Sequence, residues 1–298
     1  MPQSDKAAIS AFRQFMLCDS SNISFIWPTS GSFDLARQDP IGPEFYTPLG
    51  TAELISTIAF YLAAVLSITV LLIDKASQPR LYEAVQATFA VSVVAFFLSS
   101  IVIRTYFAVR AHSNRVADFV SNAFSVPLVP SPSEGYYNTT ATEPFLRMGA
   151  SVLENTLFTK SILRRMLRFE RTRICFYVFA WLWAALNRTT DLELLAVVAQ
   201  VLFSEELVSR WIRMEWLRSR VERLYDDLYA LIQSTTNFET KEFRARVVEG
   251  LIRYETSKAQ AGLSLSTRLF KKLDADLSRQ WSALSSQLGI GSSAASGP

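Results

Sequence analysis

The sequence of 298 residues lacks most of the side chains on which catalysis, metal binding and disulfide frameworks depend. It has one histidine, His112, and two cysteines, Cys18 and Cys175. One histidine excludes every mechanism that needs two, no acidic residue beside it would orient it, and two cysteines cannot build a disulfide framework. The sequence contains no phosphate-binding glycine loop, paired-cysteine motif, zinc-binding histidine motif or nucleophile elbow. We therefore predict neither an enzyme nor a bound cofactor or metal.

Charged side chains are scarce as well, at 19% of the residues, against about 25% in an average soluble domain. Half of the residues are hydrophobic, and the mean hydropathy is +0.18. The formal net charge of +3 is too small to indicate a nucleic acid polymer as the partner. Because the missing charge is concentrated in two blocks, the composition favours a membrane protein.

Two runs of 20 residues carry no charge, at 54–73 and 84–103. A helix needs about 20 apolar residues to cross roughly 30 Å of hydrocarbon. The first run has twelve Leu, Ile, Val or Phe residues, and tyrosines lie near the ends of the runs, where aromatic rings prefer the interface. Two buried helices of a soluble core would rarely be such uninterrupted runs joined by ten residues. We predict a transmembrane hairpin over 51–104.

A second apolar pair, at 174–187 and 194–204, is shorter and leaves three interpretations open. The first run has 14 residues, which extend about 21 Å as a helix, short of a full span. Glu193 opposes burial at the membrane centre, and residues 187–191 predict a polar turn with Asp191 as the N-cap. This hairpin at 174–204 is a short spanning pair, an interfacial or re-entrant hairpin, or the core of a soluble helical domain.

Basic residues indicate which side of the membrane the rest of the chain occupies. Ten Lys or Arg lie at 104–173 and five Arg at 210–223, whereas the short connectors carry only Lys75, Arg80 and Arg188. Because basic residues are enriched in cytoplasmic loops, both termini and the middle segment are predicted to be cytoplasmic. The predicted segments are an N-terminal cytoplasmic segment (1–50), the first hairpin (51–104), cytoplasmic helices with a Pro/Ser-rich linker (105–173), the second hairpin (174–204), a cytoplasmic helical region (205–288) and a flexible tail (289–298).

Uncharged polar side chains are spread through the first hairpin. Small hydroxyl residues let helices approach closely, or they line a water-filled path in an oligomer. Neither run contains Asp, Glu, Lys or Arg, which argues against a proton-coupled pump or an ion-pair transporter. The predicted pore-lining residues are Ser56, Ser67, Thr88, Ser92 and Ser99.

Beyond the second hairpin, apolar residues recur at helical spacing. Between Leu207 and Leu231 the steps are three or four residues, which is typical of a coiled-coil seam. This helix packs either inside its own subunit or against other subunits of an oligomer. A break at 237–240 precedes two further predicted helices, at 241–262 and 266–288.

Basic side chains also gather at 160–173, immediately before the second apolar pair. Anionic headgroups attract such charges at about 1 kcal/mol per residue. The alternative is a surface that reads phosphate, since guanidinium groups bind phosphate through two parallel hydrogen bonds. A nucleotide would also need aromatic faces, which the last helices supply, although core packing explains these aromatics equally well. The predicted ligand-binding residues are Arg164, Arg165, Arg168, Tyr254, Lys258, Arg268 and Lys271.

Three features carry a resemblance to a known family: the two uncharged runs, the Arg-rich entry to ICFYVFAWLWAALN, and the tail YETSKAQAGLSLSTRLFKKLDADLSRQW. On these features the chain resembles the SMODS-associated four-transmembrane family of bacterial antiphage effectors, which accompany cyclic-oligonucleotide synthases in CBASS operons. The resemblance covers roughly residues 54–288, and the first 50 residues do not follow the family layout. Related two-transmembrane effectors fit if the second hairpin is not inserted.

The resemblance implies an all-α protein of the bacterial inner membrane with two helical hairpins and a cytoplasmic helical region. It implies that a cyclic oligonucleotide opens a homo-oligomeric assembly, which permeabilises the lipid bilayer. A membrane-anchored scaffold or adaptor and a constitutive channel subunit are the alternatives.

Overall fold

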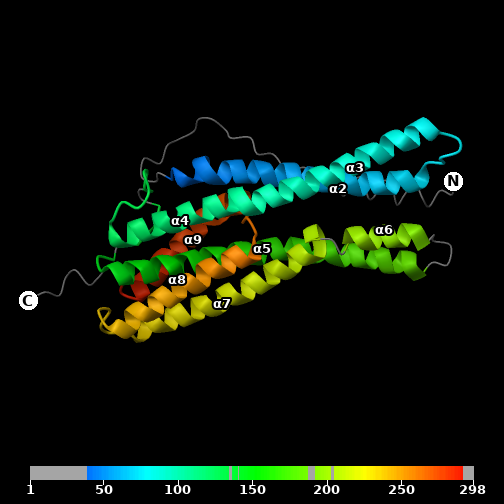
Figure 1. The fold of residues 1–298 in the computed structure, drawn as a ribbon. Helices are drawn as coiled ribbons and strands as arrows, with labels where there is room; N and C mark the ends of the chain where they lie inside the picture. The colour runs from blue at the N-terminus through cyan, green and yellow to red at the C-terminus, as the bar shows by residue number, and fades with distance from the viewer. Residues whose placement is uncertain (1–38, 134–135, 140, 187–191, 203–204, 291–298) are drawn as a thin grey trace, which may run out of the picture. The chain divides into compact units, whose positions relative to one another are not determined.

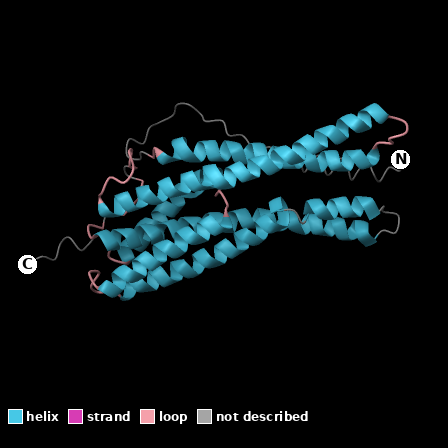
Figure 2. Ribbon diagram, viewed as in Figure 1, coloured by secondary structure: helices cyan, strands magenta, loops and turns pink. Residues whose placement is uncertain are grey.

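A computed structural model describes residues 39–133, 136–139, 141–186, 192–202 and 205–290, all within one compact unit, Arg37–Pro298. In these ranges every regular element is a helix, as the sequence predicts (Figures 1 and 2). The order is η1 (Gly42–Tyr46), α2 (Thr47–Leu72), α3 (Pro79–Val102), η2 (Ile103–Phe107), α4 (Ala108–Phe124), α5 (Pro144–Leu186), α6 (Leu192–Leu202), η3 (Glu205–Ser209), α7 (Arg210–Ser234), α8 (Lys241–Ala261) and α9 (Thr267–Gln287), where η denotes a π-helical turn.

The two uncharged runs form α2 and α3, which pack against each other in antiparallel directions (Figure 1). The rings of Phe60 and Phe96 have centroids 5.5 Å apart, and the hydroxyl oxygens of Ser56 and Ser100 lie 3.4 Å apart, about one turn away. Pro79 is in the first turn of α3, where its missing N–H forfeits no helical hydrogen bond. Both helices are long and apolar enough to cross a membrane.

Helix α3 continues without interruption into the body of the protein. Through η2 it joins α4, so that one helix of 46 residues extends from Pro79 to Phe124, about 69 Å at 1.5 Å per residue. The helix ends at Ser125, whose φ of 55° lies in the left-handed region. One rigid element therefore connects an apolar stretch with a charged one.

The main hydrophobic core lies among α5, α7, α8, α9 and the end of α4. The apolar residues of α7, which recur every three or four residues in the sequence, face this core. The buried members on α7 are Met214, Leu217, Val221, Leu224 and Leu228, while Leu207 of η3 is buried in a separate small cluster. The seam of α7 thus packs inside its own subunit, and an oligomer has to use another surface.

Two glycines bring α8 close to its neighbours. A Cβ atom at Gly149 of α5 would lie 3.1 Å from Val247 Cγ2, and one at Gly250 would lie 2.9 Å from Leu228 Cδ2. A larger side chain at either position would collide with a buried neighbour. The distances from α8 to α5 and to α7 therefore depend on these glycines.

Helices α8 and α9 begin and end within a residue of their predicted limits. The side-chain oxygens of Thr240 and Ser266 accept hydrogen bonds from the backbone N–H groups of Phe243 and Leu269, each at 3.3 Å, and so cap the first turns. Gly262 ends α8 with a φ of 55°, a left-handed conformation that is inexpensive for glycine. Local sequence signals determine these boundaries.

Helix α5 extends through the segment boundary predicted between residues 173 and 174. The boundary marks a change of side chains inside one helix of 43 residues. Beyond it the apolar side chains are exposed: Phe179 and Trp183 at 65% each and Leu186 at 83%. Helix α6 contacts this end of α5, where the indole N–H of Trp181 donates to the carbonyl oxygen of Leu195 at 3.3 Å. Among the described residues, the side chains of Phe179, Trp183 and Leu186 are therefore not part of a hydrophobic core.

The Pro/Ser-rich segment between α4 and α5 is a loop that packs against the helices around it. The N–H and hydroxyl of Ser133 donate to Asp118 at 2.8 and 2.6 Å. The side-chain amide of Asn138 donates to Glu154 at 2.6 Å, and its carbonyl oxygen accepts from the indole N–H of Trp281 at 3.1 Å. Because its polar groups find partners on α4, α5 and α9, the predicted linker is a docked part of the body.

Three further predictions about segments concern residues that the structure does not describe. Those for residues 1–38, for the polar turn at 187–191 with Asp191 as N-cap, and for the tail from residue 291 lie outside the described residues.

Candidate functional site

The apolar parts of α2 and α3 expose the side chains that a bilayer would cover. In the most apolar 18-residue stretch, 11% is buried in the helix Gly42–Leu72 and 6% in the helix Pro79–Phe124. A core helix of a soluble protein would be mostly buried. Contiguous exposed apolar surface marks a site of membrane or protein interaction.

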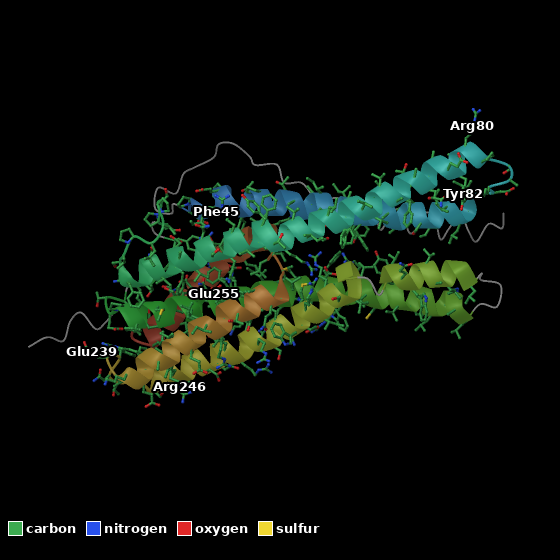
Figure 3. All side chains as sticks on the ribbon, viewed as in Figure 1. Phe45, Arg80, Tyr82, Glu239, Arg246 and Glu255 are labelled. Carbon is green, nitrogen blue, oxygen red and sulfur yellow. The ribbon has the colours of Figure 1, made fainter. Side chains whose placement is uncertain are left out.

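Aromatic and basic side chains meet at both ends of this apolar surface. At the turn between α2 and α3, the Lys75 ammonium lies 5.5 Å from the ring centroid of Tyr82, and Tyr82 and Arg80 mark this end in Figure 3. At the body end, Arg110 Nη1 donates to the Tyr106 hydroxyl at 2.9 Å, and the guanidinium lies 5.2 Å from the ring centroid of Phe45. Such pairs are typical of the water–membrane interface.

The five hydroxyl residues predicted to line a pore make hydrogen bonds within the α2–α3 pair. Ser56 contacts Ser100 across the pair, and both Ser56 and Ser92 are buried. Four of them donate to backbone carbonyl groups three or four residues earlier: Ser67, Thr88, Ser92 and Ser99. In a single chain they allow α2 and α3 to approach closely, and a role in lining a pore stays a prediction that needs an oligomer.

The predicted ligand-binding residues have different neighbours. Arg164 Nε donates to Glu222 of α7 at 2.8 Å, whereas Lys258 Nζ pairs with Glu255 of its own helix at 3.1 Å. The exposed members are Arg164, Arg165 and Arg168 on α5 and Arg268 and Lys271 on α9. Arg164 and Lys258 are therefore already engaged with carboxylates, on different helices.

Tyr254 belongs to the hydrophobic core, the alternative that the sequence left open. Its hydroxyl oxygen lies 2.8 Å from Thr159 Oγ1 of α5 and 3.4 Å from the carbonyl oxygen of Asn155. Burial raises the pKa of Tyr254, and the neighbouring Glu255 raises it further. Tyr254 is thus a neutral residue that binds α8 to α5, with one side turned toward α7.

A cluster of charged and aromatic side chains, here called the polar seam, joins α4 to η1, to the following loop and to α8. Its members are Asp39, Tyr46, His112, Arg115, Asp118, Tyr136, Glu255 and Lys258.

Arg115 is the centre of one half of the polar seam. Its Nη1 and Nη2 donate to the two carboxylate oxygens of Asp39 at 3.0 and 2.8 Å, the two-pronged geometry that makes such pairs strong. The guanidinium also lies 4.6 Å from the ring centroid of Tyr136 and 5.4 Å from that of Tyr46. Asp118 is 3.8 Å from Nη1 and buried. Arg115 thereby fastens α4 to the segment that leads into α2.

Glu255 is the centre of the other half (Figure 3). Its carboxylate lies 3.6 Å from Nε2 of His112 on α4 and 3.1 Å from Nζ of Lys258. Burial lowers the pKa of His112 below its usual 6.5, although Glu255 opposes this change. His112 is therefore mainly neutral at pH 7, when Lys258 is the cation paired with Glu255. The sequence offered no acid to orient His112, and this expectation is wrong because α8 supplies one.

The polar seam is made of charge pairs and two tyrosines. It contains three carboxylates, the guanidinium of Arg115 and the side chain of Lys258, and burial raises the pKa of Tyr46 and of Tyr136, which keeps both phenols neutral. Charge pairs of this kind can exchange partners while the apolar core stays intact.

Sequence reasoning missed the polar seam because its partners are distant in the chain. Asp39 and Arg115 are separated by 76 residues, a contact to which helical periodicity gives no access. The sequence did contain one local indication of the polar seam. Arg115 and Asp118 are three residues apart, a spacing that places both on one helix face.

No protein-family model matches the chain, and comparisons with curated proteins and with solved structures find no match. Within the described ranges, no group of three or more His, Cys, Asp or Glu residues is placed to hold a metal ion.

Proposed function

We propose that this protein is an inner-membrane effector of bacterial antiphage defence. In this proposal the α2–α3 pair spans the bilayer, and the helical body lies in the cytoplasm. A cyclic-oligonucleotide-type signal favours a homo-oligomer that permeabilises the membrane. The observation that carries the proposal is the uninterrupted helix Pro79–Phe124, which joins the exposed apolar surface to the polar seam.

Three contacts support coupling between the body and the apolar helices. Arg115 and His112 connect α4, the continuation of α3, to Asp39 and to Glu255. Ser264, in the turn after α8, donates to Glu53 of α2 at 2.6 Å. A shift of α8 relative to α4 therefore displaces both apolar helices, and a ligand that binds one arrangement more tightly changes the population of the two.

The α5–α6 pair supplies a second apolar surface beside the first. Phe60 of α2, Ile174 of α5 and Leu207 of η3 form a small cluster where the two pairs meet. Helix α6 has 11 residues, about 17 Å at 1.5 Å per residue, too short for a full span. This pair enters the cytoplasmic side of the bilayer partway, in agreement with the basic residues at 160–173 just before it.

The proposal is tested with the full chain in liposomes loaded with a self-quenched dye. A panel of cyclic di- and trinucleotides is added, and we expect dye release only with a cognate nucleotide. In Arg115→Met the response to the nucleotide should fall at least tenfold while the protein stays inserted. The matched control is Arg246→Met, which removes an exposed arginine on α8, 4.0 Å from Glu249.

Each other outcome favours a different function. Release without any nucleotide favours the constitutive channel subunit. Absence of release under every condition, with insertion demonstrated by protease protection, excludes permeabilisation and leaves the membrane scaffold or adaptor.

A further inference from the structure

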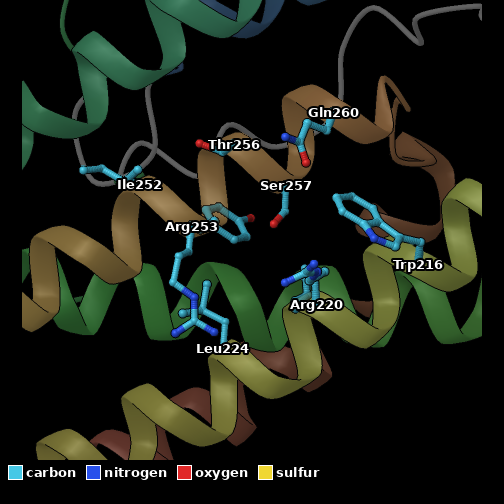
Figure 4. Close-up of a pocket in the computed structure, with 10 residues that line it drawn as sticks. Trp216, Arg220, Leu224, Ile252, Arg253, Thr256, Ser257 and Gln260 are labelled. Carbon is cyan, nitrogen blue, oxygen red and sulfur yellow. The ribbon is translucent and has the colours of Figure 1, made fainter.

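A recess lies between α7 and α8, at a surface that the polar seam does not use (Figure 4). Its volume is about 260 Å³. Trp216 and Arg220 of α7 face Arg253, Ser257 and Gln260 of α8 across it. Aromatic, cationic and hydrogen-bonding side chains thus converge on one concave surface.

The floor of the recess is apolar and rigid. Val221 and Leu224 of α7 and Tyr254 of α8 line it, and all three are buried in the main core. Because the floor is part of the packed body, the recess needs no rearrangement to exist. This preformed, mostly apolar lining with a few polar groups is typical of small-molecule sites.

Two guanidinium groups border the recess. Arg220 is exposed and lies over the ring of Trp216, with its Cζ 5.5 Å from the ring centroid. No ion pair within the described part of the chain involves Arg220. Arg253 donates through Nη1 to Asp227 at 3.0 Å and lies 3.9 Å from Glu249, so two carboxylates hold the group beside the opening. Guanidinium groups match the geometry of phosphate oxygens.

The other walls are suited to a heteroaromatic base. Trp216 presents an indole ring, and stacking on aromatic side chains tolerates every base. The Ser257 hydroxyl and the Gln260 amide can each both donate and accept hydrogen bonds, as the edge of a base requires. Inorganic phosphate would contact the arginines but not Trp216, Ser257 or Gln260.

We propose that the recess binds one nucleotide unit, with its phosphate on Arg220 and Arg253 and its base against Trp216. At about 260 Å³ the recess is smaller than the about 300–1,000 Å³ usual for ligand pockets, so it would take a single unit of a cyclic oligonucleotide and leave the others at the open mouth. This inference rests on the proposed function insofar as it assigns the signal's binding site. The binding itself is measured without reference to the membrane.

The experiment is isothermal titration calorimetry on the full chain in detergent micelles. The probes are AMP, GMP, cyclic di-AMP, inorganic phosphate and dihexanoyl phosphatidylglycerol. We expect nucleotide binding that weakens at least tenfold in Arg220→Gln and in Trp216→Leu. Trp216→Leu should leave any binding of inorganic phosphate unchanged. The matched control is Arg223→Gln, an exposed arginine of the same helix outside the recess, and it should bind as the parent does. Helical circular dichroism verifies that each variant is folded.

Several results would overturn the inference. These are no binding of any nucleotide, binding that Arg220→Gln and Trp216→Leu leave unchanged, or phosphate and nucleotide binding equally well. A preference for dihexanoyl phosphatidylglycerol that depends on Arg220 would reassign the recess to lipid headgroups. Nucleotide binding without dye release would leave this inference standing while the proposed function fails. Nucleotide-dependent dye release that persists in Arg220→Gln would overturn this inference and leave the proposed function standing.

Discussion

Lys160 shows how one residue's surroundings change its chemistry. Its Nζ lies 2.9 Å from the ring centroid of Tyr225 on α7. Burial and, after it, the charge of Arg164 lower its pKa from the ordinary 10.5 to about 8. Because about half of a group is deprotonated at its pKa, brief treatment with acetic anhydride at pH 8 should acetylate Lys160 about tenfold faster than exposed Lys241. Peptide mass spectrometry measures the ratio, and equal rates at the two lysines would contradict the prediction.

The same residue makes the stability of the fold depend on pH. Between pH 8 and 10.5 the unfolded chain binds more protons at this lysine than the folded chain does. The contribution of Lys160 to the free energy of unfolding therefore rises with pH across that window and is constant below it. Thermal unfolding of the parent and of Lys160→Met, compared from pH 7 to 10, should show a Tm difference that changes only above about pH 8. A parallel pair of curves would exclude the shift.

At the scale of elements, the docking of α9 depends on one aromatic side chain. Trp281 is 1% exposed and donates its indole N–H to the loop between α4 and α5. Trp281→Ala should lower the free energy of unfolding by about 3–5 kcal/mol, because it leaves a cavity and an unsatisfied carbonyl group. Trp281→Phe should cost less, since a ring remains.

Hydrogen exchange locates this effect. In Trp281→Ala, amides of α9 and of residues 136–139 should exchange faster, while those of the α2–α3 pair should not change. The exposed neighbour Ser282→Ala serves as the control. Unchanged exchange at 136–139 in Trp281→Ala would show that α9 does not hold the loop.

At the scale of the whole molecule, the question is which apolar surfaces the bilayer covers. An arginine at the centre of a spanning helix costs about 2.5–3.5 kcal/mol. Val94→Arg, at a 55% exposed position of α3, should therefore lower the carbonate-resistant membrane fraction. If the α5–α6 pair enters only partway, as we propose, Trp183→Arg on α5 should lower it less. Ile252→Arg, at a 59% exposed position of α8, is the matched control and should have no effect. Equal losses for all three would show general misfolding instead of membrane depth.

The sequence predicted those features of the structure that depend on residues near one another in the chain. The uncharged runs at 54–73 and 84–103 identified α2 and α3, because membrane-scale hydrophobicity is a property of a single segment. Thr240, Gly262 and Ser266 marked the ends of α8 and α9, since capping involves residues three or four apart. The stripe of α7 showed that the helix is amphipathic, but not which partner covers it.

The tertiary structure alone decided the contacts between segments. It joined Asp39 to Arg115, Glu255 to His112, and Thr159 to Tyr254 across 95 residues. It also placed the α7 seam inside the subunit and opened a recess between Trp216 and Ser257. Such contacts depend on how whole helices pack and cross, and helical periodicity specifies a buried face without naming its neighbour. The sequence by itself determined an all-helical chain with two membrane-length helices, and only packing decided where its charged residues meet.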